Sequence, residues 1–143
     1  KRFEFNATKK GIQMIASNLC GNTMIYSDNV RIQQILDNLV SNALKFSQSG
    51  LRIWIESRFD NDGNVIFEVR DEGPGISEND KRKLFTKFAK LSARPTGHEN
   101  STGLGLSIVK KLAEIMNCQI WCESQLGKGT SFMLKVPFAN LND

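Results

Sequence analysis

The chain has 143 residues, of which 40% are hydrophobic and 24% are charged, the balance of a single globular domain in water. Its 19 basic and 15 acidic side chains are interspersed and give a formal net charge of +4, so no basic tract indicates nucleic acid or an acidic membrane surface. No apolar run reaches the roughly 18 residues that a membrane span requires, and no signal peptide opens the sequence. We therefore expect a cytoplasmic domain without direct membrane contact.

The first predicted elements are the tail of a helix over residues 1–10 and a strand over residues 12–17, where apolar residues alternate. Apolar residues recur at helical spacing over residues 28–47, which predicts a long helix. The segments 51–59 and 64–71 flank the turn "DNDG", and this arrangement predicts a hairpin.

The second half begins with a short helix over residues 76–85, because "ISENDKRKLF" carries a Ser-x-x-Asp capping pattern. Residues 89–103 contain proline and glycine with few apolar residues, so we expect a mobile loop there. A helix over residues 104–116 and a second hairpin, formed by 118–124 and 130–138, complete the chain. These elements predict an α+β fold, a two-layer sandwich with helices on one face of a mixed, mostly antiparallel sheet.

The three cysteines, Cys20, Cys118 and Cys122, include no C-x-x-C pair, and the chain has one histidine to join them in a metal site. Cys118 and Cys122 are four residues apart in a predicted strand, so their side chains share one face of it. We expect buried free thiols in a reducing compartment.

Three polar residues interrupt the apolar pattern of the long helix. At about 100° per residue, Asn38, Asn42 and Lys45 fall within about 60° of one another. A solvated helix flank explains such a stripe. A ligand site is the alternative explanation, because an amide oxygen suits a hard cation such as Mg²⁺ and an ammonium group suits phosphate.

The segment "DEGPGI", residues 71–76, follows a predicted strand and also has two interpretations. It is an ordinary Gly-Pro turn if Gly73 and Gly75 supply positive φ angles. It is a binding loop if the Asp71 carboxylate accepts a hydrogen bond from an amino group while the glycines let a flat ring lie against the backbone. In both interpretations Asp71 is expected in a loop.

The segment "STGLGLSIVKK", residues 101–111, places two glycines at the start of a predicted helix. It is not a P-loop, because G-K-[ST] is absent, and Ile108 stands where a dinucleotide fingerprint needs its third glycine. A glycine segment that leads into a helix N-terminus favours an anion, and Gly103 and Gly105 would let the backbone close on phosphate oxygens. The apolar residues expected to anchor this helix in the core are Leu104, Leu106, Ile108, Val109 and Leu112.

Taken in order, these motifs resemble the ATP-binding catalytic domain of sensor histidine kinases, within the superfamily of gyrase, Hsp90, histidine kinases and MutL, which share the Bergerat ATP-binding fold. The resemblance covers nearly the whole chain. The segments similar to the N, G1, F, G2 and third glycine boxes are "DNLVSNALKFS", "DEGPGI", "KLFTKFAKL", "STGLGLSIVKK" and "GKGTSFML". The resemblance implies a kinase that binds ATP and Mg²⁺ and transfers the γ-phosphate to a histidine in two-component signal transduction or a phosphorelay.

The resemblance also implies roles for individual residues. Asn42 would coordinate Mg²⁺, Asn38 would support the phosphates, and Lys45 would pair with them, which makes these three the expected catalytic residues. Phe46 would pack near adenine, and Asp71 would accept a hydrogen bond from the adenine amino group.

Further residues are implied in nucleotide binding by the same resemblance. Gly73 and Gly75 would border the base, Ile76 would line its pocket, and Thr130 would lie behind Asp71. The G2-box residues around the phosphates would be Ser101, Thr102, Gly103, Leu104, Gly105 and Leu106.

The loop over residues 89–103 corresponds to the ATP lid of the family. Phe85 and Phe88 would hold this lid, and Lys90 occupies a position where the family often has a basic lid residue, with Arg94 as an alternative.

Asn38 helps to choose among related activities. In the ATP-hydrolysing branch of the superfamily the matching residue is typically glutamate, a general base that activates water, and an amide cannot take that proton. A gyrase-like or chaperone-like ATPase is therefore disfavoured. A degenerate nucleotide-binding module is disfavoured too, because none of the five boxes is missing.

His98 is the one histidine of the chain, and it lies in the predicted lid rather than on an acceptor helix. The resemblance therefore implies that residues 1–143 are one catalytic domain from a larger kinase, whether or not that parent protein is anchored in a membrane. The expected partners are a dimerisation and histidine phosphoacceptor domain, in the same parent chain or in trans, and the receiver domain of a downstream response regulator.

Overall fold

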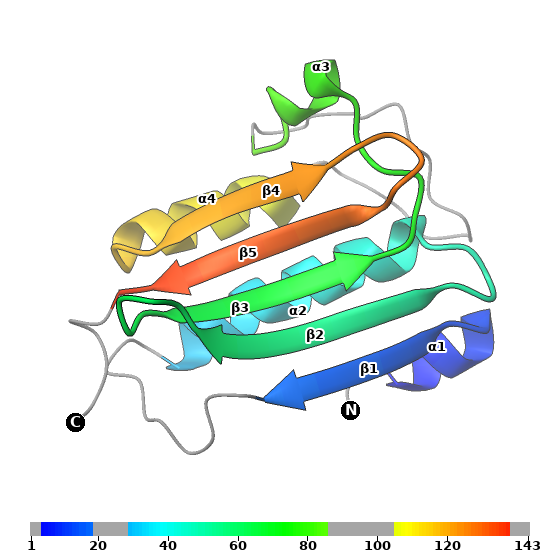
Figure 1. The fold of residues 1–143 in the computed structure, drawn as a ribbon, viewed down its shortest axis with the longest axis horizontal. Coiled ribbons are helices and arrows are strands. Elements are labelled where there is room, and N and C mark those ends of the chain that lie inside the picture. Colours follow the sequence, from blue (N-terminus) through cyan, green and yellow to red (C-terminus); the bar gives the residue numbers. More distant parts are fainter. Residues whose placement is uncertain (1–3, 19–28, 86–104, 138–143) are drawn as a thin grey trace.

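The computed structural model describes residues 4–18, 29–85 and 105–137 (Figure 1). Along the chain these residues form α1 (Glu4–Lys10), β1 (Gln13–Asn18), α2 (Asn29–Phe46), β2 (Arg52–Phe59), β3 (Val65–Asp71), α3 (Glu78–Lys81), α4 (Gly105–Ile115), β4 (Gln119–Ser124) and β5 (Thr130–Val136). The strands form one five-stranded sheet in the order β1-β2-β3-β5-β4, in which β1 and β2 are parallel and the other pairs are antiparallel. The predicted α+β class and both predicted hairpins are confirmed.

Helices α2 and α4 pack on the same face of this sheet, behind it in the view of Figure 1. Ile35 and Leu39 of α2 and Val109 of α4 are fully buried against sheet residues such as Ile53 and Leu134, all at 0% exposure. Their spacing of three or four residues along each helix gives one apolar stripe that faces the strands. Burial of each such side chain stabilises the fold by roughly 1.5–3 kcal/mol.

One of the residues expected to anchor α4 in the core does not do so. Ile108 is 41% exposed, whereas Val109 is buried and Leu106 and Leu112 pack partly against the core. Ile108 lies about 100° around the helix axis from Val109, at the edge of the buried face, and so points toward solvent. Leu104 lies outside the described residues.

Helix α3 is shorter than the sequence predicts. Its predicted cap is confirmed, since the Ser77 hydroxyl accepts a hydrogen bond from the Asp80 N–H at 3.1 Å. The helix ends at Lys81 instead of continuing toward residue 85, because Leu84 N–H bonds to the Lys81 carbonyl in a tighter turn. This turn brings Leu84 into the core at 3% exposure.

The expectation of buried free thiols is confirmed for Cys118 and only in part for Cys122. Both are free thiols; Cys118 is buried in the apolar core cluster, whereas Cys122 is half-buried and packs against it. Burial raises the pKa of Cys118 to about 11 and that of Cys122 to about 12, so neither is a reactive thiolate at neutral pH. Cys20 lies outside the described residues.

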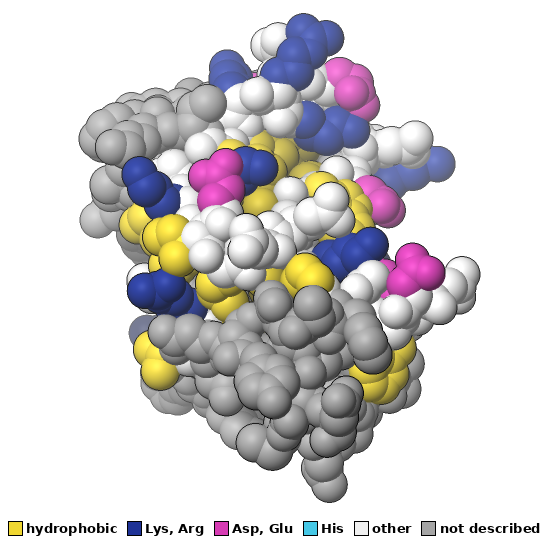
Figure 2. Space-filling view, turned by 90° about the vertical axis from the view of Figure 1, so that its left-hand side faces the viewer, with side chains coloured by type: hydrophobic (Ala, Val, Ile, Leu, Met, Phe, Trp, Pro, Cys, Tyr) yellow, Lys and Arg dark blue, Asp and Glu magenta, His cyan; other side chains and the backbone are white. Residues whose placement is uncertain are grey.

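Two surface properties agree with the composition. On the face drawn in Figure 2, Lys and Arg side chains are scattered among Asp and Glu side chains and apolar atoms. Among the helices in the described part of the chain, none is both long enough and apolar enough to cross a membrane.

The turn between β4 and β5 lies against the end of β3 so closely that one position excludes a side chain. Asp71, the last residue of β3, pairs with Thr130, the first residue of β5. The preceding Gly129 has φ +83°, and a Cβ there would lie 2.1 Å from the Asp71 carbonyl oxygen. Glycine is therefore required for both the backbone conformation and the contact.

We expect Gly129→Ala to destabilise the domain much more than Gly127→Ala, its matched control in the same turn. Gly127 has φ +80°, but a Cβ there meets nothing within 4 Å. Both changes carry the left-handed penalty of about 1–2 kcal/mol. Only Gly129→Ala also forces β5 away from β3, which should lower the free energy of unfolding by at least about 2 kcal/mol more. Urea denaturation measures the difference, and equal losses would contradict the close contact.

Candidate functional site

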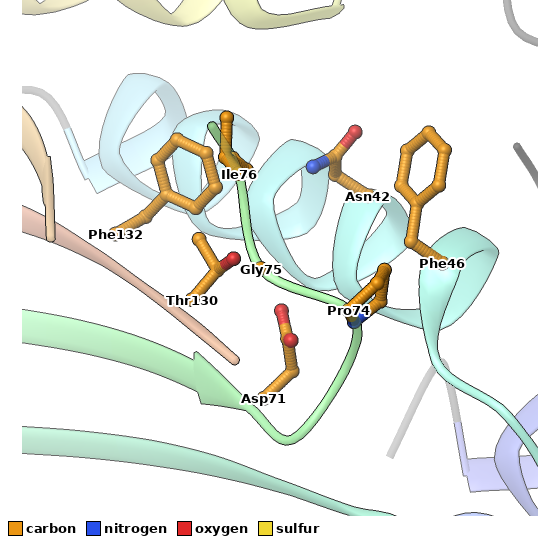
Figure 3. A pocket seen from close by; sticks show the side chains of 8 residues that line it. All are labelled: Asn42, Phe46, Asp71, Pro74, Gly75, Ile76, Thr130 and Phe132. Carbon is orange, nitrogen blue, oxygen red and sulfur yellow. The ribbon is translucent and has the colours of Figure 1, made fainter. Parts of the chain in front are cut away.

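A pocket opens between α2 and the end of the sheet at which β3 ends and β5 begins (Figure 3). The space between its walls, open solvent included, is about 360 Å³. Side chains of α2 face those of the strands and of the loop after β3 across this space. The lining residues are Asn42, Phe46, Asp71, Pro74, Gly75, Ile76, Thr130 and Phe132.

Asp71 is the acidic residue of this pocket, and it is buried at 9% exposure. It is the last residue of β3, as the predicted strand over residues 64–71 has it, and its pairing with Thr130 holds it in the sheet, so the expectation that it lies in a loop is wrong. Its Oδ1 accepts a hydrogen bond from the Gly73 N–H at 2.8 Å, and the Thr130 N–H is a second main-chain donor. Burial raises the pKa of Asp71 to about 6, against the opposing effect of these two donors.

Gly73 allows the hydrogen bond to Asp71 through its lack of a side chain. The predicted positive φ angle is wrong for this residue, which is not among the glycines with positive φ. A Cβ on Gly73 would lie 2.9 Å from Asp71 Oδ1 and 3.4 Å from the Phe46 carbonyl oxygen. The absence of a Cβ therefore lets the N–H approach the carboxylate.

Gly75 does have the predicted positive φ, at +77°, and it brings the loop after β3 against the β4–β5 turn. A Cβ at this position would lie 2.0 Å from the Gln125 carbonyl oxygen. The Gly127 N–H donates to the Pro74 carbonyl at 2.7 Å, and the Ile76 N–H donates to Ser124 Oγ at 2.8 Å. The pocket wall over residues 73–76 is thus fixed from the C-terminal hairpin.

An ion pair fixes the same loop from the other side. Glu72 follows Asp71 directly and accepts hydrogen bonds from the Arg52 main-chain N–H at 2.8 Å, from Nε at 3.2 Å and from Nη2 at 2.8 Å. These hydrogen bonds, with the charge of Arg52, hold the pKa of Glu72 below its ordinary value. Arg52 also lies 5.0 Å from the ring centre of Trp54. The residue that follows Asp71 therefore has a defined partner in Arg52 of β2.

Of the three polar residues predicted as a stripe on α2, only Asn42 lines the pocket. Asn42 and Phe46 lie one turn apart and both line the pocket (Figure 3). Asn38, one further turn back, donates through Nδ2 to the Gln34 carbonyl at 3.1 Å. Its Oδ1 lies 3.7 Å from the place of a Cβ on Gly105, at the start of α4. Lys45 is half-buried and does not line the pocket.

The start of α4 is the described part of the segment expected around phosphates. Gly105 is the first residue of the helix, so the N–H groups of its first turn lack partners within the helix. Leu106 packs partly against the core and does not line the pocket. The other residues predicted for this region lie outside the described residues: Phe88, Lys90, Arg94, His98, Ser101, Thr102, Gly103, Leu104 and the lid over 89–103.

Two residues of the pocket wall and one residue behind it were not predicted from the sequence. Phe132 lies two residues after Thr130, on the same face of β5, and alternation along that strand could have identified it. Its ring packs edge-on against Phe85, with centroids 6.3 Å apart and an interplanar angle of 82°. Pro74 belongs to the segment "DEGPGI", in which the sequence predicts a turn role for the proline and no contact with a ligand. Ser124, which bonds to Ile76, had no sequence signal.

Comparison with known proteins gives a family match over most of the chain. The sequence profile described as histidine kinase-, DNA gyrase B-, and HSP90-like ATPase matches residues 27–140. The autoinducer 2 sensor kinase/phosphatase LuxQ of Vibrio parahaemolyticus is 38% identical over 133 residues, which cover 90% of this chain and 16% of that protein. The chain spans 16–18% of the length of this relative and of the next two in rank, so it corresponds to a small part of each.

Comparison with solved structures also finds histidine kinases, as proteins of similar fold. Full-length ShkA in complex with AMPPNP matches with a TM-score of 0.82 and 29% identity, over 95% of this chain and 27% of that one. Histidine kinase ThkA in complex with response regulator protein TrrA matches with a TM-score of 0.75 and 30% identity, over 95% of this chain and 37% of that one. The chain therefore belongs to the histidine kinase-, DNA gyrase B- and HSP90-like ATPase family, and within it to the catalytic domains of sensor histidine kinases.

Proposed function

We propose that this domain binds Mg-ATP in the pocket at Asp71 and supplies the γ-phosphate to a histidine on a separate dimerisation and phosphoacceptor domain. The observation that carries the proposal is the Asp71 carboxylate, which is buried in a pocket whose other walls are largely apolar. Two main-chain N–H groups orient it, and a carboxylate has about four lone-pair sites, so it can also accept a hydrogen bond from a ligand in the pocket that it lines. Such a carboxylate suits a ligand that is flat, apolar on its faces and a hydrogen-bond donor at its edge.

Adenine has these properties. Its exocyclic amino group would donate to Asp71, and its faces would lie between apolar side chains such as Phe46 and Ile76. Gly75 would let the ring approach the loop backbone, which is where the sequence prediction also places it. The relative ShkA was solved with AMPPNP, an adenine nucleotide analogue, which supports this class of ligand.

The helix α2 would direct the nucleotide from base to phosphates. Phe46, Asn42 and Asn38 are successive residues along one side of this helix, each about 6 Å further along its axis. Asn38 faces the start of α4, where the helix N-terminus favours an anion. The triphosphate would therefore extend along α2 toward Gly105, within reach of Lys45.

Asn42 is the residue that we assign to Mg²⁺. In the described part of the chain, no group of three His, Cys, Asp or Glu side chains could hold a metal ion. An amide oxygen together with substrate phosphates fits magnesium, which keeps several waters and uses few protein ligands. When bound, Mg²⁺ neutralises charge on the phosphate oxygens.

The same residues favour transfer over hydrolysis. Asn38 has an amide where a water-activating carboxylate would be needed, and its Nδ2 donates to the Gln34 carbonyl. The histidine acceptor would come from another domain of the parent kinase. A response regulator would then take the phosphoryl group, as the complex of the relative ThkA with TrrA suggests.

The pKa of Asp71 gives the proposal a pH dependence with a definite sign. Since the pKa is raised from 3.8 to about 6, the contribution of Asp71 to stability is complete below pH 3.8 and is lost as the pH rises through about 6. An amino-group donor stabilises the ionised form. Binding of adenine should therefore be strongest above pH 6 and weaken as the carboxylate becomes protonated.

We expect the domain at pH 7.5 to bind ATP roughly 10–150-fold more tightly than purine riboside triphosphate, which lacks the amino group, because a hydrogen bond to a charged acceptor is worth about 1.5–3 kcal/mol. This ratio should decline between pH 7.5 and pH 5, whereas Asp71→Asn should show a low ratio throughout. Calorimetric titration measures both nucleotides, and their common phosphates cancel in the ratio. A wild-type ratio that does not change with pH would remove Asp71 from base recognition.

Asn42→Ala should weaken the binding of Mg-ATP far more than the binding of ATP in the presence of a chelator, because only the first uses the amide as a metal ligand. Gln33→Ala, an exposed change on the same helix, is the control and should alter neither. Calorimetry with and without Mg²⁺ distinguishes the two forms. An equal loss in both would show that Asn42 contacts the nucleotide without the metal.

The isolated domain should bind Mg-ATP, hydrolyse it negligibly and leave His98 unphosphorylated. Transfer of the γ-phosphate needs a nucleophile held in line with it, and a cognate phosphoacceptor domain would provide this nucleophile in trans. Mixing the two polypeptides with labelled ATP should produce acid-labile phosphohistidine on the acceptor. Rapid phosphate release by the domain alone, abolished by Asn38→Ala, would favour an ATPase.

A further inference from the structure

Ser124 lies behind the pocket wall, at the end of β4, and is not one of the residues that line the pocket. Its hydroxyl nevertheless has three partners. It accepts a hydrogen bond from the Ile76 N–H at 2.8 Å, donates to the Gly129 carbonyl at 2.7 Å and lies 3.0 Å from the Thr130 hydroxyl. Ser124 therefore joins both segments that approach Asp71, the loop after β3 and the start of β5.

Counting protons fixes the direction of the third contact. A serine hydroxyl has one proton and two lone pairs. The Gly129 carbonyl can only accept, so the Ser124 proton goes to it, and the Ile76 N–H can only donate, so it takes one lone pair. The remaining lone pair faces Thr130, whose hydroxyl must then donate its proton to Ser124.

This direction determines what Thr130 presents to a ligand. Thr130 lines the pocket, and its hydroxyl lies on the same side as the Asp71 carboxylate in Figure 3. With its proton directed to Ser124, the Thr130 oxygen has only lone pairs for the pocket. Asp71 and Thr130, which are paired across β3 and β5, thus form two adjacent acceptors and no donor.

We propose that Ser124 is a positioning residue for base selection, which favours a 6-amino purine over a 6-oxo purine by holding the Thr130 hydroxyl as an acceptor. This inference rests on the proposed binding of a purine nucleotide at Asp71. A 6-amino group offers two N–H donors to the two acceptors. A 6-oxo group places an acceptor against these two acceptors, so the ligand loses the hydrogen bonds that the 6-amino group makes.

Loss of the Ser124 hydroxyl should change this selection through Thr130. In Ser124→Ala the Thr130 hydroxyl is free to rotate and to donate its proton to a 6-oxygen. The other contact of Ser124, in which Lys81 Nζ donates to its main-chain carbonyl at 2.8 Å, does not depend on the side chain. The variant therefore removes the hydroxyl while it leaves this connection to α3 in place.

The test compares the dissociation constants of Mg-ATP and Mg-ITP for the intact domain by calorimetry. Ser124→Ala should lower the preference for ATP over ITP by about three- to tenfold, the effect of one neutral hydrogen bond. Ser131→Ala is the matched control, because Ser131 follows Thr130 on the opposite face of β5 and should leave the preference unchanged. Ser124→Thr retains a hydroxyl and should also retain the preference.

A double variant separates positioning from a general structural role. If Ser124 acts through Thr130, then Ser124→Ala should have no further effect on the ATP/ITP preference in a Thr130→Val background. If Ser124→Ala does not fold, Ser124→Cys preserves the volume with a weaker donor and acceptor, and its preference should fall in the same direction. Equal weakening of both nucleotides, or an effect that persists without the Thr130 hydroxyl, would overturn the inference. Failure of the wild-type domain to bind either nucleotide would instead overturn the proposed function.

Discussion

The structure depends on one contact, the place where the end of β3 meets the β4–β5 turn without room for side chains. Gly129 lies against the Asp71 carbonyl, and Gly75 lies against the Gln125 carbonyl. At either glycine, a Cβ would clash with the neighbouring carbonyl oxygen. This contact pairs Asp71 with Thr130 and holds the loop after β3 against the C-terminal hairpin. This part of the pocket wall is therefore built from two segments that are far apart in sequence, the end of β3 with the loop after it and the C-terminal hairpin.

This contact explains how an unfavourable group is kept in place. Asp71 is buried, and its raised pKa of about 6 means that the ionised form is less stable here than in water. Main-chain donors from Gly73 and Thr130 satisfy part of the carboxylate, and the surrounding ion pair of Arg52 with Glu72 fixes the backbone next to it. In the proposed function, a donor from the ligand would complete its hydrogen bonds, and the cost of burial would become selectivity for a base with an amino group. In the further inference, the Ser124 hydroxyl would hold the Thr130 hydroxyl as a second acceptor for the same amino group.

Much of this fold could be predicted from the sequence, because long periodic segments and hairpin turns determine their own structure. The end of α3 was less predictable, because the helix stops at Lys81 where Leu84 turns into the core. The exposure of Ile108 was also hard to predict, because this residue lies at the edge of the buried face of α4. The carboxylate of the pocket was identified from its motif, but its place within the sheet depends on pairing with β5, which no local pattern contains. Ser124 shows the same limit more clearly, since its hydroxyl has partners 48, 5 and 6 residues away along the chain.

Asp71 is a buried carboxylate that can accept a further hydrogen bond from a ligand, and nuclear magnetic resonance of its side-chain carboxyl carbon measures the consequence for its pKa. Titration of the free domain should give a pKa of about 6 for Asp71, well above the ordinary 3.8. Saturation with Mg-ADP should lower this pKa, because the amino group stabilises the ionised form, whereas a 6-unsubstituted purine nucleotide should lower it much less. A pKa near 3.8 in the free domain, or one that Mg-ADP leaves unchanged, would contradict the account.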